Sequence, residues 1–102
     1  MNQIDLGPAD NGRQIQMGLA DTILVRLPES GAAGAGWGVA VAGPARVTED
    51  WAEPPSGPVA GAALVRYLGL AAQASGQVVL RAVRHNPWDD TVEEYSVELT
   101  VT

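Results

Sequence analysis

Turn-forming residues interrupt this sequence at short intervals, which leaves room only for short secondary-structure elements. They include Asn11-Gly12, Gly43-Pro44, Pro54-Pro55, Ser75-Gly76 and Asn86-Pro87. Between the turns lie short runs in which apolar and polar residues alternate, the two-residue period of a half-buried strand. Turn signals about 8–12 residues apart are typical of an all-β domain.

Residues 94–101 show the clearest alternation. Apolar side chains fall on one face and polar side chains on the other: Tyr95, Val97, Leu99 and Val101 against Glu94, Ser96, Glu98 and Thr100. A helix would scatter the apolar residues around its circumference, because it has about 3.6 residues per turn. The run therefore predicts a strand. Further strands are predicted at 14–17, 22–27, 37–41 and 77–85, of which 22–27 and 77–85 are apolar on both faces and suit the interior of a sheet.

Residues 59–74 are the one segment in which helix competes with strand. The segment is rich in alanine and leucine, and alanine is a strong helix former. Its centre, residues 64–68, contains Val65 and Tyr67, which favour a strand. We favour a long strand here, and a strand with a helical turn stays open.

Residues 41–59 are interrupted by Pro44, Pro54, Pro55 and Pro58. Proline has no N–H to donate to a sheet and is confined to edges and strand ends. This segment is therefore predicted to be a long surface crossing with at most a short edge strand.

The pattern as a whole predicts one antiparallel β-sandwich of about seven to eight strands. No long amphipathic helices alternate with the strands, which argues against a doubly wound α/β fold. The 102 residues suit a single domain spanning 1–102. Because 46% of the residues are hydrophobic, the chain can bury a core.

The charge distribution argues against nucleic acid and membrane partners. The formal net charge is −6, and all six basic residues are arginines scattered along the chain. DNA and anionic lipid surfaces both attract clustered basic residues, which are missing here. No run approaches the ~20 apolar residues of a transmembrane helix, and the N-terminus does not resemble a signal peptide. The chain is expected to be either cytoplasmic or a mature periplasmic or secreted domain.

Residues suited to catalysis or metal binding are sparse. With no cysteine and only His85, a zinc site lacks ligands and a thiol nucleophile is excluded. His85 is predicted to be a surface residue at a strand end rather than part of a Ser-His-Asp triad. The acidic cluster Asp89, Asp90, Glu93 and Glu94 lacks the ligand spacing of a calcium site. It is predicted to be a solvated loop, as is the group around Glu49, Asp50 and Glu53.

Residues 31–36 form a glycine- and alanine-rich segment. Its spacing does not match the phosphate-binding fingerprints, and neither a lysine nor a helix follows. The absence of bulky side chains indicates instead a loop whose backbone can approach another molecule closely.

The three tryptophans have different predicted places. Trp37 begins a strand and is assigned to the core. Trp51 lies in the proline-flanked acidic segment, and Trp88 follows Pro87 in a predicted turn. A tryptophan in a polar loop either packs back onto the core or contacts a partner, and for Trp88 both options stay open.

The order of these loops resembles the chagasin family, protein inhibitors of papain-like cysteine peptidases. The resemblance spans nearly the whole chain. It is carried by Leu27-Pro28 before a glycine-containing loop and Trp37, by Pro54-Pro55, by the small residues at 61–63, and by Pro87-Trp88 between the last two strands.

The resemblance implies an immunoglobulin-like sandwich in which three loops at one end enter the peptidase cleft. The peptidase-binding residues would be Ser30, Gly31, Ala32, Ala33 and Gly34 in the first loop, Gly61, Ala62, Ala63 and Leu64 in the second, and Asn86, Pro87 and Trp88 in the third. It further implies a reversible inhibitor that is a monomer when free, with no catalytic residue, metal or cofactor.

Two other functions are weighed against inhibition. Ala32 and Ala33 stand where the family has threonines, and Asn86 where it has arginine. These differences favour a non-inhibitory binding module of the same descent as the alternative. A hydrolase, resting only on His85 and the nearby acids, ranks last.

Overall fold

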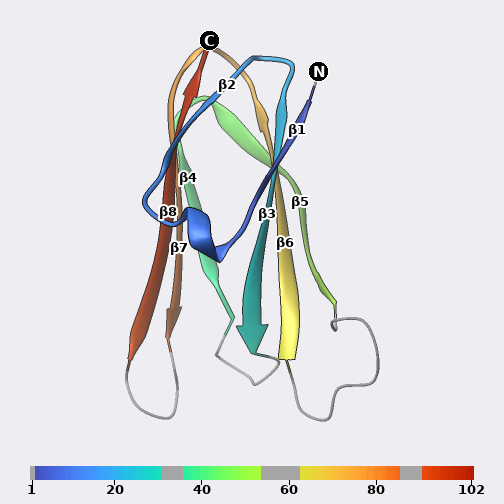
Figure 1. Ribbon diagram of the computed structural model, residues 1–102, viewed down its shortest axis with the longest axis vertical. Helices are drawn as coiled ribbons and strands as arrows, with labels where there is room; N and C mark the ends of the chain where they lie inside the picture. Colours follow the sequence, from blue (N-terminus) through green and yellow to red (C-terminus); the bar gives the residue numbers. More distant parts are fainter. Residues whose placement is uncertain (1, 31–35, 54–62, 86–90) are drawn as a thin grey trace.

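Two four-stranded sheets face each other in the computed structural model (Figure 1). The structure describes residues 2–30, 36–53, 63–85 and 91–102. The first sheet has the order β1-β3-β6-β5 and the second β2-β8-β7-β4. The strands are β1 (Gln3–Leu6), β2 (Gln14–Met17), β3 (Thr22–Ser30), β4 (Gly38–Ala42), β5 (Ala45–Glu53), β6 (Ala63–Ala72), β7 (Gly76–His85) and β8 (Val92–Val101), with a 3-10 turn η1 (Pro8–Asp10) between β1 and β2. The predicted β-sandwich of about seven to eight strands is confirmed.

The core between the sheets is built from alternate residues of the long strands. On β8 the four apolar residues of the predicted alternation are all buried. The same period places Ile23, Val25 and Leu27 of β3, Leu68 and Leu70 of β6, and Val78, Leu80 and Ala82 of β7 in the core. Because successive side chains of a strand point to opposite faces, each strand supplies one apolar row to a single shared interior.

Residues 59–74, where helix and strand were both open, form a strand in the part that the structure describes, which is β6. It runs from Ala63 to Ala72 and pairs with β3 on one side and β5 on the other. The prediction of a long strand is confirmed there. Backbone pairing along both edges and burial of Leu68 and Leu70 outweigh the weak helix preference of alanine.

Strand β5 is longer than the sequence analysis predicts. It covers nine residues, Ala45–Glu53, and pairs antiparallel with β6 at the edge of the first sheet. The prediction of at most a short edge strand is wrong, because the prolines of this region precede residue 45 or follow residue 53 and do not interrupt the strand. A bulge between Val47 and Glu49 shifts its register, a feature common in edge strands.

The N-terminal strands add parallel pairs to a sandwich that is otherwise antiparallel. β1 pairs parallel with β3, and β2 pairs parallel with β8. Residues 7–21 carry the chain from the first sheet through η1 and β2 in the second sheet and back to β3. A parallel pair needs a connection of about a dozen residues or more, which this excursion provides. Among the described residues, no helix has the length and apolar character needed to cross a bilayer.

Leu68→Ala tests how much stability the shared interior provides. The Leu68 side chain is 0% exposed, so its truncation leaves a cavity and should cost about 2–5 kcal/mol of unfolding free energy. Leu19→Ala is the matched control: Leu19 is 49% exposed, and its loss should change stability by less than about 0.5 kcal/mol. Urea unfolding followed by circular dichroism measures both. Equal losses in the two variants would contradict this placement of the core.

Candidate functional site

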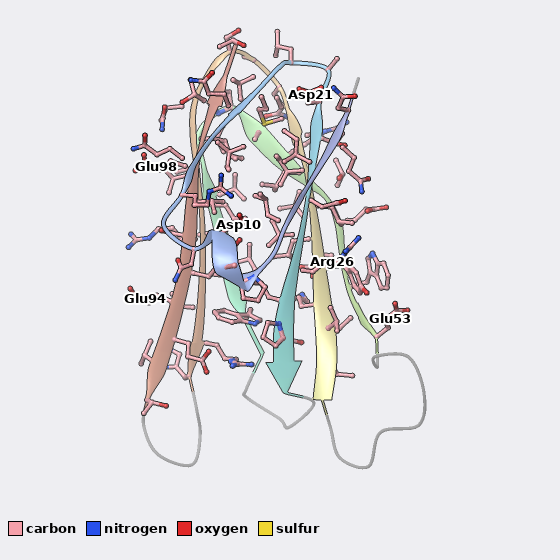
Figure 2. All side chains as sticks on the ribbon, in the orientation of Figure 1. Asp10, Asp21, Arg26, Glu53, Glu94 and Glu98 are labelled. Atoms are coloured by element: carbon pink, nitrogen blue, oxygen red, sulfur yellow. The ribbon has the colours of Figure 1, made fainter. Side chains whose placement is uncertain are left out.

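The strands that border the three predicted loops all end at one side of the sandwich, at the bottom of Figure 1. Register pairing brings the bordering residues together within each sheet. Ser30 at the end of β3 pairs with Ala63 at the start of β6, and His85 at the end of β7 pairs with Val92 at the start of β8. Figure 2 shows Glu53, the last residue of β5, at the same side. We call this side the loop-bearing end, bordered by Ser30, Gly38, Glu53, Ala63, His85 and Val92.

The predicted peptidase-binding residues divide between the described strands and the segments that join them. Ser30 closes β3, Ala63 opens β6, and Leu64 is half-buried on β6 opposite Glu29. The other predicted contacts lie outside the described residues: Gly31, Ala32, Ala33, Gly34, Gly61, Ala62, Asn86, Pro87 and Trp88. Their contacts with a peptidase stay a prediction.

Trp37 lies in the core as predicted and closes the base of the first loop. It is 7% exposed. Its indole Nε1 donates to the Pro28 carbonyl at 2.7 Å, and its backbone N–H donates to Glu29 Oε2 at 3.1 Å. Residue 37, which follows the first loop, is thereby bound to the two residues before Ser30. The residues on either side of that loop are therefore held together by bonds that lie outside it.

Arg66 of β6 connects the base of the second loop to that of the first. Its guanidinium forms a bidentate pair with Asp50 of β5, with Nη2 at 3.0 Å from Oδ2. Its Nη1 donates to Glu29 Oε2 at 2.7 Å and to the Trp37 carbonyl at 3.4 Å. The bond to Asp50, followed by that to Glu29, raises the pKa of Arg66 further above its usual value, against the opposing effect of partial burial. The guanidinium therefore stays charged.

Arg84 of β7 connects the base of the third loop to that of the first. Its Nη2 donates to Glu93 Oε1 of β8 at 2.6 Å, and its Nη1 donates to the Pro28 carbonyl at 3.0 Å. Its guanidinium carbon lies 4.9 Å from the centroid of the Trp37 ring, a distance suited to a cation–π contact. Arg84 belongs to the second sheet and Pro28 to the first, so this side chain bridges the two layers.

Neither arginine is among the site residues predicted from the sequence, although the two-residue period of the strands places both in an inward row. Arg66 continues the inward row of Leu68 and Leu70, and Arg84 continues that of Leu80 and Ala82. A charged residue in an apolar row needs a partner. Each arginine finds one where the apolar core gives way to the loop-bearing end.

The remaining candidates do not assemble into a catalytic or metal centre in the described part of the chain. His85 is exposed at the end of β7, as predicted. No group of three or more histidine, cysteine, aspartate or glutamate residues there could hold a metal ion. Glu93 belongs to the ion pair with Arg84, and Asp89 and Asp90 lie outside the described residues. Trp51 is 44% exposed and stacks on Tyr67, with ring centroids 4.2 Å apart.

Sequence comparison alone gives no relative for this chain. No protein-family model matches it, and no curated protein sequence matches it. Its fold, in contrast, matches solved structures along the full length.

The crystal structure of the cysteine protease inhibitor EhICP2 from Entamoeba histolytica aligns with all of this chain and 97% of its own, at a TM-score of 0.87 and 14% identity. This chain shares that inhibitor's fold. The solution structure of amebosin aligns over 98% of both chains, at a TM-score of 0.65 and 14% identity. PbICP-C, solved in complex with falcipain-2, aligns over 100% of both chains, at a TM-score of 0.61 and 11% identity. The resemblance predicted from the loops is thus confirmed at the level of the fold.

Trp37→Phe tests the closure of the first loop base. Phenylalanine loses the indole N–H that bonds Pro28, so the variant should lose about 1–3 kcal/mol of unfolding free energy. Trp51→Phe is the matched control, because phenylalanine can keep the exposed stacking on Tyr67. It should change stability by less than about 0.5 kcal/mol. Denaturant unfolding decides, and a larger loss in the Trp51 variant would refute the role given to Trp37.

Proposed function

We propose that this chain is a reversible protein inhibitor of papain-like cysteine peptidases, which fills the active-site cleft with the loops of its loop-bearing end. The observation that carries the proposal is the full-length similarity of the fold to EhICP2, at a TM-score of 0.87. The complex of PbICP-C with falcipain-2 adds a cysteine protease as the kind of partner. A chain of this kind blocks a reaction and performs none of its own.

The composition of the loops suits entry into a narrow cleft. Residues 31–34 carry no side chain larger than a methyl group, so their backbone can approach the catalytic cysteine of the peptidase closely. The second loop at 61–64 and the third at 86–88 would cover the peptidase surface on either side. In this arrangement Trp88 is the main apolar anchor, the residue type that most often dominates binding energy at interfaces.

The hydrogen bonds at the loop bases support such binding. A loop that is ordered before it meets its partner loses less conformational freedom on binding. The ties at Trp37, Arg66 and Arg84 order the residues on which the loops are mounted. A complex of this type typically buries on the order of 1,600 Å² in total.

The alternative, a binding module without inhibitory activity, is favoured by specific residues. Alanine at 32 and 33 removes the hydroxyl groups that the family pattern carries in its first loop, and asparagine at 86 removes a positive charge from the third. In that case the same end of the sandwich would bind a protein that is not a peptidase. Measuring inhibition separates the two functions.

Inhibition of papain or a cathepsin should be competitive against a small peptide substrate. Because the loops and the substrate occupy the same cleft, the apparent KM rises with inhibitor concentration while kcat is unchanged. Activity should return on dilution, and the chain should be recovered uncut by mass spectrometry. Absence of inhibition at micromolar protein across a panel of papain-like peptidases would leave the binding-module alternative in place.

Trp88→Ala should weaken inhibition without unfolding the protein. Loss of an aromatic anchor costs about 2 kcal/mol or more at an interface, roughly a thirtyfold rise in Ki. The control is Leu19→Ala: Leu19 is an exposed apolar residue in the turn between β2 and β3. Asp21 of the same turn lies at the end opposite the loops (Figure 2). Equal inhibition constants for the two variants would show that Trp88 is not part of the interface.

A further inference from the structure

The bases of the three loops are joined to one another by two arginine side chains. The first base is Pro28, Glu29 and Trp37; the second is the end of β5 with the start of β6; the third is the end of β7 with the start of β8. We propose that Arg66 and Arg84 are positioning residues, which fix the three bases in one relative arrangement and so present the loops together. The inference rests on the proposed function for its consequence in inhibition, and on the described contacts for the arrangement itself.

The two arginines make equivalent contacts. Each pairs with an acidic residue of its own base: Arg66 with Asp50 across β6 and β5, and Arg84 with Glu93 across β7 and β8. Each then reaches the first base, Arg66 through Glu29 and Arg84 through the Pro28 carbonyl. The second and third bases are therefore coupled through the first, with Trp37 in contact with both arginines.

These contacts add directional bonds to the packing of the core. The hydrophobic effect that drives burial between the sheets is itself non-directional. Charge-assisted hydrogen bonds are directional, and a guanidinium with donors in a rigid plane holds several acceptors at set angles. The side chains of Arg66 and Arg84 are each 17% exposed. The bond from Arg66 to Glu29 is the most shielded from water, because the Glu29 side chain is only 10% exposed.

A lysine could not replace either arginine. Its ammonium is a single point of charge on a flexible stem. At position 84 it would keep an attraction to Trp37 and reach either Glu93 or Pro28, but not hold both in a fixed geometry. Arg84→Lys should therefore restore only part of the coupling that Arg84→Met removes.

The absence of cysteine allows a direct measurement. Nitroxide spin labels are attached at Glu53→Cys and His85→Cys, two exposed positions on the second and third bases. Pulsed electron double resonance then gives the distribution of distances between the two labels. We expect one narrow distribution in the parent, a broader or shifted one with Arg66→Met or Arg84→Met, and an intermediate one with Arg84→Lys. If Arg84→Met does not fold, the comparison is made with Arg84→Lys, whose distance distribution should still be broader than that of the parent.

Two controls separate positioning from general stability. Arg26→Met removes an exposed arginine of β3 whose ion pair is with Asp5 of β1 rather than with a residue of the loop bases. Val78→Ala weakens the core at a residue of β7 that is 0% exposed and pairs with Leu99 rather than with a partner of either arginine. Neither should broaden the distribution, measured on samples frozen from temperatures well below unfolding. Broadening with Val78→Ala equal to that with Arg84→Met would overturn the inference, as would an unchanged distribution in both folded arginine variants.

Inhibition gives the second readout. Without labels, Arg66→Met and Arg84→Met should each raise the Ki for papain by on the order of tenfold, because loops that are no longer held together must be ordered on binding. Arg26→Met should leave Ki unchanged. If the parent protein inhibits no papain-like peptidase but the distance distributions still broaden, the proposed function fails and the positioning role stands. Broadening without any change in Ki would overturn the link between the two.

Discussion

Trp37 holds the two sheets together where the loops begin. Its indole and backbone N–H both donate to β3 of the first sheet, while its ring lies against the guanidinium of Arg84 from the second. Glu29 shares one carboxylate oxygen between Trp37 and Arg66. Without the indole, Arg84 would lose the ring on which its guanidinium lies, and the Pro28 carbonyl would lose one of its two donors. Arg66, in contrast, bonds the backbone carbonyl of Trp37.

Different residues provide the stability of the sandwich and the geometry of its loop-bearing end. Its stability comes from apolar rows whose members need only be hydrophobic and of suitable size, which explains how a fold can be shared at 14% identity with EhICP2. Its shape at the loop-bearing end depends on a few polar contacts with defined geometry. The residues that border the loops are paired with one another by contacts outside the loops, so these borders do not depend on the loop sequences.

The sequence predicted what depends on local pattern and missed what depends on distant partners. The alternation in β8, the strand at β6 and the buried Trp37 all follow from a two-residue period. The sequence pattern underestimates the length of β5, because prolines at the borders of a strand do not exclude the strand between them. The parallel pairs of β1 and β2 depend on which sheet each strand joins, a choice made by packing. The same period places Arg66 and Arg84 in the inward rows, but it does not reveal their partners, which lie as far away as residues 29 and 28.

Arg84 also bears on how the third loop can bind. The chagasin pattern places an arginine directly before the proline and aromatic residue, where this chain has Asn86, and Arg84 stands two positions earlier. Arg84 does not replace that charge for a partner, because its guanidinium is already bound to Glu93, Pro28 and Trp37 inside the protein. Under the proposed function, we expect the third loop to bind through the Trp88 indole and backbone groups. A peptidase that binds it in this way would need an apolar surface at that point rather than an acidic one, and we expect salt to affect this contact little.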